Sequence, residues 1–337
     1  MTMQKLLNDP GSFVDEMLEG LLLAHPLQIR PGTSARTIVR PGRPTEPGSP
    51  RVAIVTGGGS GHLPLFVGYV GEGMVDGVAV GDVFASPSSE QVLAVTRDVS
   101  RGAGVVYVYG NYSGDLLNFG LGAELALADG IETRTVLGCD DIASAAPGSE
   151  SDRRGIAGMF FLFKVAGARA REGGALDDVV AVTEAASRGL RSMGVALSPC
   201  TVPAAGRATF DLPTGVMEIG MGIHGEPGVR TGRLEAADRV AEELVRGLES
   251  DLPYRPGDRV AVLVNGLGAT PLEELYIVYR RVHQVLTEDG ITVARAWVGE
   301  FATSLEMAGA SVSLLRLDGD LERLVVAPCD SILFRQG

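Results

Sequence analysis

The chain has 337 residues, 45% of them hydrophobic, and a formal net charge of -13, because 42 Asp and Glu outnumber 29 Lys and Arg. This length supports a large buried core and lies at the upper end for one domain, so two domains are expected. The acidic balance argues against a nucleic-acid partner, which would need clustered Lys and Arg to neutralise phosphates. The three cysteines, Cys139, Cys200 and Cys329, have no CxxC spacing and indicate neither a disulfide framework nor a zinc site.

The first 26 residues surround a short apolar run with acidic side chains, unlike the basic-then-apolar plan of a signal peptide. They predict an amphipathic helix. No stretch reaches the roughly 18 uncharged apolar residues that a membrane span needs, and the nearest one, GMFFLFKVAGA, is interrupted by Lys164. We therefore expect a cytoplasmic protein with no membrane partner, and the cysteine usage agrees with a reducing compartment.

From residue 50 onward, short apolar runs alternate with longer helical patterns, which is typical of βαβ units. A strand is predicted at 51–56, and Pro64 suits the first turn of a helix after the glycine-rich loop. The same rhythm predicts strands at 77–84, 104–110 and 131–138, and helices near 88–99 and 116–129. Ligands bind at the carboxyl ends of strands in open α/β sheets, so the loops GGGSGH, GDVFASPSS and GNYSGD are expected to converge.

Residues 140–155 form a polar stretch whose length indicates a functional or mobile loop. Two helices are predicted after it, at about 156–172 and 176–191. At MGVALSPCTVPAAGR the composition shifts toward Pro, Thr and Gly, which predicts domains at 1–190 and 191–337. In the second domain we expect a strand running into a turn at 217–228, helices at 235–248 and 271–288, and strands at 258–266, 291–299 and 311–317. The predicted fold class is two α/β domains, each with a central sheet flanked by helices.

The run Gly57-Gly58-Gly59-Ser60-Gly61-His62 follows a predicted strand. It matches neither the Walker A motif, which needs Lys after its last glycine, nor the GxGxxG dinucleotide fingerprint. A tight structural turn and a nucleotide-phosphate site are two interpretations of it. We favour a third, a small-ligand site with exposed backbone amides and the His62 imidazole as polar groups.

His224 lies in the motif Gly222-Ile223-His224-Gly225-Glu226-Pro227-Gly228 at the end of a predicted strand. A lone histidine is more often structural than catalytic. Here the neighbouring glycines remove side-chain cover, and that leaves an accessible imidazole of the sort that a nucleophile or base requires.

Asp115 follows a strand in GNYSGD and opens a predicted helix. Its simpler interpretation is an N-cap for that helix. Its functional interpretation is a base that accepts the proton of a substrate hydroxyl, as kinases require.

Other polar side chains have simpler explanations. Asp82 lies at another strand end, where Ser88 or Ser89 can cap the following helix. Asp140 and Asp141 could bind magnesium, although a solvated loop is the simpler account. Arg153 and Arg154 could meet a phosphate or a partner, but paired arginines on a loop usually form a solvated surface.

Six motifs together resemble the K subunit of dihydroxyacetone kinases, and they occur in family order over most of the chain. They are GGGSGH at 57–62, GDVFASPS, NYSGD, DRRG at 152–155, MGVALSPCTVPAAG at 193–206 and GIHGEPG at 222–228. A set of long motifs in this order is far more specific than any one of them.

The resemblance implies a homodimer of two-domain α/β subunits that bind a small ketose. By resemblance, His224 forms a hemiaminal with the ketone carbon, while His62 and Asp115 hydrogen-bond the substrate hydroxyls and provide the base that assists phosphoryl transfer. The substrate-binding residues it implies are Gly59, Ser60, Gly61, His62, Gly110 and Asp115. Covalent attachment would act mainly by fixing the position of the acceptor hydroxyl.

The resemblance places the phosphate donor on a separate L-type subunit or domain, which holds ATP or ADP with Mg. That nucleotide is used directly or is recharged by a phosphotransferase-system protein. No cofactor or metal is expected on this chain, which contains no second region able to form the L-type helical barrel. We therefore expect it to be inactive alone.

Two positions depart from the family pattern. Many members have GGGSGHEP and a lysine before NYTGD, whereas this sequence has Leu63 and Gly110 at those positions. Both changes remove a charge from the pocket rim and one removes bulk. They make a four-carbon ketose such as erythrulose a reasonable substrate beside dihydroxyacetone.

Two rival interpretations belong to other functional classes. The first is a non-enzymatic ketose-sensing subunit that binds a regulator protein, which loss of His62 or Asp115 would have favoured. The second is a nucleotide-binding kinase complete in one chain, which the absence of Walker A disfavours.

Overall fold

The computed structural model describes residues 5–42 and 50–337. The chain forms two compact units, and each is assembled from segments that are separate in the sequence. In the described chain, the first unit comprises residues 5–42, 50–137, 161–185 and 323–337, and the second comprises 138–160 and 186–322.

The predicted division into 1–190 and 191–337 differs from this arrangement. The chain passes from one unit to the other after residues 137, 160, 185 and 322, and we call these points crossings. The predicted boundary lies near the crossing after 185, and the other three crossings were not predicted. Residues 140–142 explain the difference, because they pair with strand β8 (Leu190–Ala196). The Ser192 amide donates to the Asp140 carbonyl at 2.7 Å, and the Ile142 amide donates to the Ser192 carbonyl at 3.1 Å. This pairing joins the 140–155 loop to the second unit.

The first unit contains a six-stranded sheet in the order β1-β2-β5-β3-β6-β7. Strand β3 pairs in parallel with β5 and β6, as βαβ units require, and β1 and β2 extend the sheet in antiparallel fashion. The strands are β1 (Arg30–Pro31), β2 (Thr37–Val39), β3 (Ala53–Ser60), β5 (Gly77–Val83), β6 (Val105–Gly110) and β7 (Thr133–Gly138).

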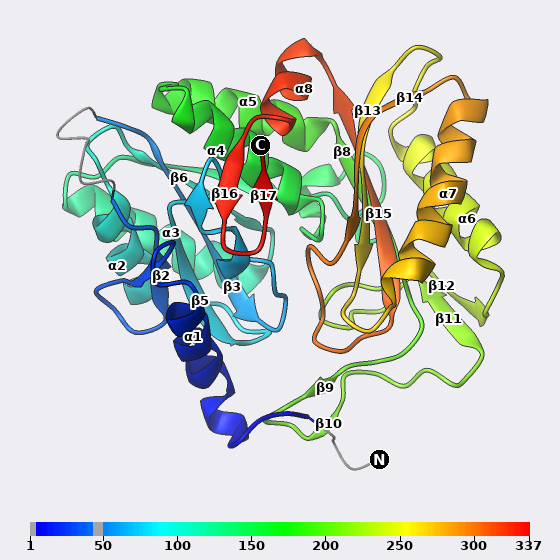
Figure 1. The fold of residues 1–337 in the computed structure, drawn as a ribbon, viewed down its shortest axis with the longest axis horizontal. Helices are drawn as coiled ribbons and strands as arrows, with labels where there is room; N and C mark the ends of the chain where they lie inside the picture. The colour runs from blue at the N-terminus through cyan, green and yellow to red at the C-terminus, as the bar shows by residue number, and fades with distance from the viewer. Residues whose placement is uncertain (1–4, 43–49) are drawn as a thin grey trace. The chain divides into compact units, whose positions relative to one another are not determined.

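Helices α2 (Ser89–Val99) and α3 (Ser113–Ala128) lie side by side next to this sheet (Figure 1). Helix α2 begins with a capping box in which Ser88 and Gln91 exchange hydrogen bonds, which confirms Ser88 as a cap. The core between helices and sheet is apolar and includes Val55, Val92, Val105, Tyr107 and Phe119. The predicted strand–helix alternation of this region is confirmed.

Two expectations about the glycine-rich segment are wrong. Gly57 to Ser60 continue β3 instead of forming a loop after it. No α-helix begins at Pro64, since residues 63–66 form turns and lead into a 3-10 helix at Val67–Tyr69. The strand continues because its glycines allow close packing: a Cβ on Gly58 would lie 2.2 Å from the Phe66 ring, and one on Gly59 would lie 2.6 Å from the Ala85 nitrogen.

The remaining elements of the first unit include the predicted amphipathic N-terminal helix and a small three-stranded sheet. They are α1 (Phe13–Ala24), β4 (Gly71–Glu72), β16 (Cys329–Ser331), β17 (Arg335–Gln336) and a 3-10 helix at Pro10–Ser12. Helices α4 (Met159–Arg171), α5 (Leu176–Arg188) and α8 (Gly319–Val325) each cross from one unit to the other. Lys164 in α4 is fully buried and donates to the carbonyls of Leu324, at 3.4 Å, and Ala327.

The second unit contains a mixed six-stranded sheet in the order β12-β11-β8-β15-β13-β14. Only β13 and β14 pair in parallel among its described strands. Besides β8, its strands are β11 (Val216–Ile219), β12 (Arg230–Arg233), β13 (Arg259–Gly266), β14 (Thr292–Gly299) and β15 (Gly309–Leu317). A small hairpin, β9 (Thr201–Val202) and β10 (Arg207–Ala208), and a 3-10 helix at Glu150–Asp152 complete its elements.

Helices α6 (Ala237–Asp251) and α7 (Leu272–Glu288) lie side by side next to the second sheet (Figure 1). Their buried faces pack with Val262, Val264 and Val312 of the central strands. Both units are therefore α/β, with a central sheet flanked by helices, as predicted. Across the described ranges, no helix is long and apolar enough to cross a membrane.

Candidate functional site

The loops that follow β3, β5 and β6 lie at one edge of the first sheet, because these three strands run parallel. Helix α3, which follows β6, contacts the loop after β5, since the Asn118 amide donates to the Ser86 hydroxyl at 3.3 Å. The loop after β5 is fixed to the end of β3, where the Phe84 amide donates to the Ser60 carbonyl at 3.0 Å. The predicted convergence of the three loops is confirmed.

His62 is buried at this edge, with 1% of its surface exposed. Its ring stacks on Phe84, with ring centroids 4.9 Å apart and an angle of 24° between the planes. Phe84 has a φ of 58°, a left-handed conformation that costs a non-glycine residue energy and is frequent at functional sites. An aromatic contact thus fixes the His62 ring.

Asp115 lies in the first turn of α3 and is 7% exposed. The N-cap residue is Tyr112, and its side chain makes no capping hydrogen bond, so the interpretation of Asp115 as the N-cap is wrong. The helix dipole favours a negative charge at this position. Burial raises the pKa of Tyr109 to about 12, and the nearby Asp115 carboxylate adds to that shift. Gly110, the last residue of β6, is buried.

His224 lies in the loop 220–228, five residues beyond the end of β11. The loop turns sharply, with φ of 79° at Gly220 and 86° at Gly225, values that favour glycine. The Gly225 amide donates to the Gly222 carbonyl at 3.0 Å. The His224 side chain is 24% exposed, which leaves the imidazole accessible, as predicted.

Glu226 contacts His224 twice. One carboxylate oxygen lies 3.0 Å from the imidazole Nδ1, and the other accepts the His224 backbone amide at 3.0 Å. Burial acts to raise the pKa of Glu226, but the hydrogen bond and charge of His224, together with Arg154, outweigh it and set the pKa at about 2. An ionised carboxylate can only accept, so Nδ1 must carry the proton. In the neutral ring, Nε2 is then the unprotonated nitrogen.

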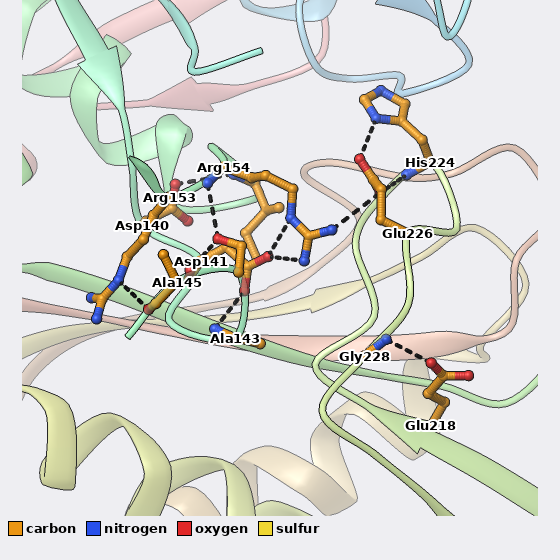
Figure 2. Close-up of polar contacts among 12 residues, drawn as sticks. Asp140, Asp141, Ala143, Ala145, Arg153, Arg154, Glu218, His224, Glu226 and Gly228 are labelled. Carbon is orange, nitrogen blue, oxygen red and sulfur yellow. Dashed lines mark hydrogen bonds and ion pairs between the residues drawn. The ribbon is translucent and has the colours of Figure 1, made fainter. Parts of the chain in front are cut away.

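Arg154 connects this pair to Asp141 (Figure 2). Its guanidinium lies 2.8 Å from an Asp141 carboxylate oxygen and 3.7 Å from Glu226. Asp141 is 1% exposed, and burial raises its pKa to about 6 against the opposing charge of Arg154. The interpretation of Arg154 as part of a solvated surface is therefore wrong.

Arg153 points away from Arg154 and is fully buried (Figure 2). It forms a bidentate pair with Asp251 at 2.6 and 2.8 Å, to which Arg191 also contributes. Asp140 is equally buried and accepts the amides of Ile156 and Gly158, both at 3.0 Å. The solvated-loop interpretation of 140–155 is thus wrong for Asp140, Asp141 and Arg153.

No group of three or more metal-ligating side chains occurs among residues 5–42 and 50–337. Asp140 and Asp141 direct their oxygens at backbone amides and at Arg154, which accounts for both carboxylates without a magnesium ion. Asp82 lies on the surface, where Arg36 pairs with it and with Asp15. Asp140 and Asp82 therefore contribute to the fold alone, whereas Asp141 contacts Arg154 next to His224 and Glu226.

The sequence indicated His62, Asp115 and His224 as functional candidates, and it offered Arg154 only as a possible contact of a phosphate or a partner. Phe84 and Glu226 were missed, although Glu226 had a detectable signal, since it lies two residues from the candidate histidine in a turn-forming motif. The contact of Arg154 with Glu226 could not be predicted, because it joins segments 72 residues apart. His62 and Asp115 belong to the first unit, and His224 belongs to the second.

Comparison with known proteins supports one family. The Dak1 domain profile matches residues 19–333. A PTS-dependent dihydroxyacetone kinase 2, dihydroxyacetone-binding subunit DhaK, from Listeria innocua is 43% identical over 333 residues, covering 99% of each chain. An L-erythrulose kinase from Pectobacterium atrosepticum is 45% identical over 99% of this chain, which spans only 57% of that relative. The chain belongs to the dihydroxyacetone kinase family, in its DhaK branch.

Solved structures agree with this assignment. The dihydroxyacetone kinase of C. freundii superposes with a TM-score of 0.88 at 32% identity, over all of this chain and 61% of that one. A structure named dihydroxyacetone kinase operon co-activator Dha-DhaQ superposes with a TM-score of 0.89 at 33% identity, over 95% of this chain and 98% of that one.

Proposed function

We propose that this chain is the ketose-binding subunit of a dihydroxyacetone-kinase-type enzyme and captures its substrate covalently on His224. The observation that carries the proposal is the ionised Glu226 at Nδ1, which leaves Nε2 unprotonated on an accessible ring. The substrate is a short hydroxyketone, either dihydroxyacetone or a tetrulose such as erythrulose. A separate L-type subunit then phosphorylates one of its terminal hydroxyls.

The capture step forms a C–N and an O–H bond and breaks the carbonyl π bond and the Nδ1–H bond. The Nε2 lone pair attacks the ketone carbon, and the carbonyl π electrons move to oxygen, which takes up a proton from water. The ring, now positively charged, returns to neutrality when its Nδ1 proton passes to the hydroxide left from that water, and Glu226 stabilises the charged stage. A polyol has no carbonyl carbon, so this chemistry selects ketoses over polyols.

His62 and Asp115 are proposed to bind the hydroxyls of the captured ketose, with Asp115 as the base that accepts the proton of the attacking hydroxyl. Their burial supports this role, because hydrogen bonds and charges act more strongly where water is excluded. Backbone groups of Gly59, Ser60, Gly61 and Gly110 are proposed to complete the binding surface. The stacking of Phe84 keeps His62 oriented.

The substrate size is proposed from Leu63 and Gly110. Leu63 lines a small cavity together with Gly58 to Gly61, so an apolar side chain takes the place of a charged one there. Several relatives that cover 99% of this chain at 44 to 45% identity are named D- or L-erythrulose kinases. A four-carbon ketose is therefore proposed as a substrate alongside dihydroxyacetone.

The phosphate donor is proposed to be ATP with Mg on an L-type partner, or a phosphotransferase-system protein acting through it, and the subunit is proposed to be a homodimer. The names of two matching proteins support an L-type partner and these phosphate donors. The C. freundii kinase, of which this chain matches 61%, has been crystallised with AMP-PNP and Mg2+. The Listeria relative is named PTS-dependent.

A second candidate function is ketose sensing with a regulator protein as partner. The likeness to the structure named an operon co-activator favours it, because the match extends over 95% of this chain. Capture of a ketose fits both functions. Only phosphorylation in the presence of an L-type subunit and ATP distinguishes them.

Native mass spectrometry of the wild type and His224→Ala tests the proposal, with dihydroxyacetone, both erythrulose enantiomers, longer ketoses and the matching polyols. We expect an adduct of the mass of the whole ketose with wild type only, and none with polyols. An adduct retained in His224→Ala, or polyol binding equal to ketose binding, would contradict covalent capture.

A further inference from the structure

Four side chains of the second unit form a continuous series from a buried carboxylate to the reactive ring: Asp141, Arg154, Glu226 and His224 (Figure 2). The contacts are 2.8 Å between Arg154 and Asp141, 3.7 Å between Arg154 and Glu226, and 3.0 Å between Glu226 and the His224 ring. The charges of the first three members alternate, so Arg154 attracts a carboxylate on either side.

Asp141 gives the series a rigid base. Its side chain accepts the Ala143 amide at 3.1 Å and the Arg154 Nε at 3.1 Å. The backbone closes around the same pair, because the Asp141 amide donates to the Arg154 carbonyl at 3.1 Å. The Arg154 amide in turn donates to the Ser144 hydroxyl at 2.9 Å. Hydrogen bonds to both the backbone and the side chain of Arg154 therefore fix the position of its guanidinium.

Gly222 leaves the space that the Arg154–Glu226 contact occupies. A Cβ at this position would lie 2.2 Å from a Glu226 carboxylate oxygen and 2.6 Å from an Arg154 guanidinium nitrogen. Both atoms are the ends of flexible side chains, so a methyl group there would move them without disturbing the backbone. The absence of a side chain at Gly222 therefore permits this arrangement.

We propose that Arg154, seated on Asp141, is a positioning residue that fixes the Glu226 carboxylate against His224 and so sets which ring nitrogen carries the proton. In this role Arg154 does not touch the substrate. It neutralises part of the charge of a half-buried carboxylate and limits its rotation, so that Glu226 keeps accepting from Nδ1. Its effect on capture rests on the proposed function of His224, but its effect on the tautomer does not.

The tautomer can be measured directly, because the chain has four histidines. Long-range 1H–15N spectra of protein with 15N-labelled histidine, recorded at pH 8 and assigned with His224→Ala, report the protonated nitrogen of each ring. We expect wild-type His224 with the proton on Nδ1. In Arg154→Gln and in Gly222→Ala we expect both His224 nitrogens to shift toward the values of a tautomer mixture.

Arg246→Gln is the matched control. Arg246 also bridges two carboxylates, Glu249 and Asp289, but neither belongs to the His224 series. His25 gives an internal reference, since its Nδ1 lies 3.1 Å from the Gln28 side-chain oxygen in the first unit. We expect Arg246→Gln to leave the His224 signals unchanged, and we expect the His25 signals to be the same in every variant. Gly222→Ala keeps every charge of the series, so it decides the question if Arg154→Gln does not fold.

Capture by native mass spectrometry gives the second readout. We expect adduct formation to be about tenfold slower in Arg154→Gln and Gly222→Ala, with partial rescue in Arg154→Lys. Wild-type tautomer and wild-type capture rate in both variants would overturn the proposal, as would a wild-type His224 protonated on Nε2. If wild type forms no adduct at all, the proposed function fails, and the tautomer spectra still decide the role of Arg154.

Discussion

His62 is 1% exposed and its ring stacks on an aromatic side chain, whereas the His224 side chain is 24% exposed and contacts an ionised carboxylate. In the first environment, packing against Phe84 fixes the orientation of the ring. In the second, the contact with Glu226 fixes the orientation of the ring and also which nitrogen carries the proton. If the proposed function holds, changes near His62 should alter how tightly the ketose is bound, and changes near His224 should alter whether the ring can react at all.

The largest expected effect separates the two histidines. His224→Ala should lose the ketose adduct completely, because no other group replaces the Nε2 lone pair. His62→Ala should still form the adduct with about tenfold weaker capture, since it loses only hydrogen bonding and stacking. Native mass spectra report both, and His283→Ala, at an exposed position of helix α7, serves as the control. Equal loss of the adduct in His62→Ala and His224→Ala would contradict the proposed difference between the two histidines.

Asp115→Asn should separate binding from phosphoryl transfer. The amide keeps the size of the side chain but cannot accept a proton, so adduct formation should be retained while turnover falls by about 10²-fold or more. The measurement is ketose phosphorylation with ATP and an L-type subunit that is active with the wild type. Unchanged turnover would remove Asp115 from the role of base.

Arg153→Met tests the contrast between a buried and an exposed ion pair of the second unit. We expect it to destabilise the fold by about 3 kcal/mol, because Asp251 would lose one of its two buried cationic partners. Arg246→Met, at an exposed ion pair, should cost less than about 1 kcal/mol. Urea unfolding gives both values. A similar cost at the two sites would mean that burial does not set the strength of these pairs.

Restoring the family residues should change substrate preference at the first unit's edge. Leu63→Glu combined with Gly110→Lys adds charge and bulk, and should shift the ratio of dihydroxyacetone to erythrulose capture about tenfold toward dihydroxyacetone. Leu63→Gln with Gly110→Met controls for size without charge. An unchanged ratio would exclude these two positions as determinants of ketose length.

The smallest expected effect concerns stability and pH. The pKa of Glu226 is held at about 2, below its ordinary value of 4.5, so its ionisation stabilises the folded state fully above pH 4.5, and this contribution is lost as the pH falls toward 2. Allowing for solvent screening, Glu226→Gln should cost about 1–2 kcal/mol at pH 6 and less than half of that at pH 3. Urea unfolding at the two pH values tests this, and a pH-independent cost would argue against the ionised pair.

The sequence predicted those parts of the fold that depend on local patterns. Apolar runs between glycine-rich turns predicted β5, β6 and α3, and the motif around His224 predicted an accessible ring. Strand β8 was missed because its core-forming residues are mixed with Arg191, Ser192 and Gly194, which resemble a helix end and a loop. The burial of Arg153 was also invisible, since its partner Asp251 lies 98 residues away.

Local patterns also failed where glycines serve packing. The run at 57–59 has the composition of a loop, yet it forms a strand because Phe66, Phe84 and Ala85 occupy the space that side chains would fill. At the site, the motif contained Glu226 but gave no indication of its ionised state. That state depends on the balance between burial, which raises the pKa of Glu226, and the hydrogen bond with His224, which lowers it, and Arg154 adds a smaller contribution from a distant segment.

Helix α4 crosses from one unit to the other after residue 160. This crossing limits how the protein can be divided into fragments. Neither unit can be expressed as one uninterrupted stretch of sequence. A cut at any single position would leave one of the units without part of its chain. Residue-by-residue exchange is therefore a better way to dissect the two histidine environments than truncation, and hybrids with relatives are best joined at the four crossings.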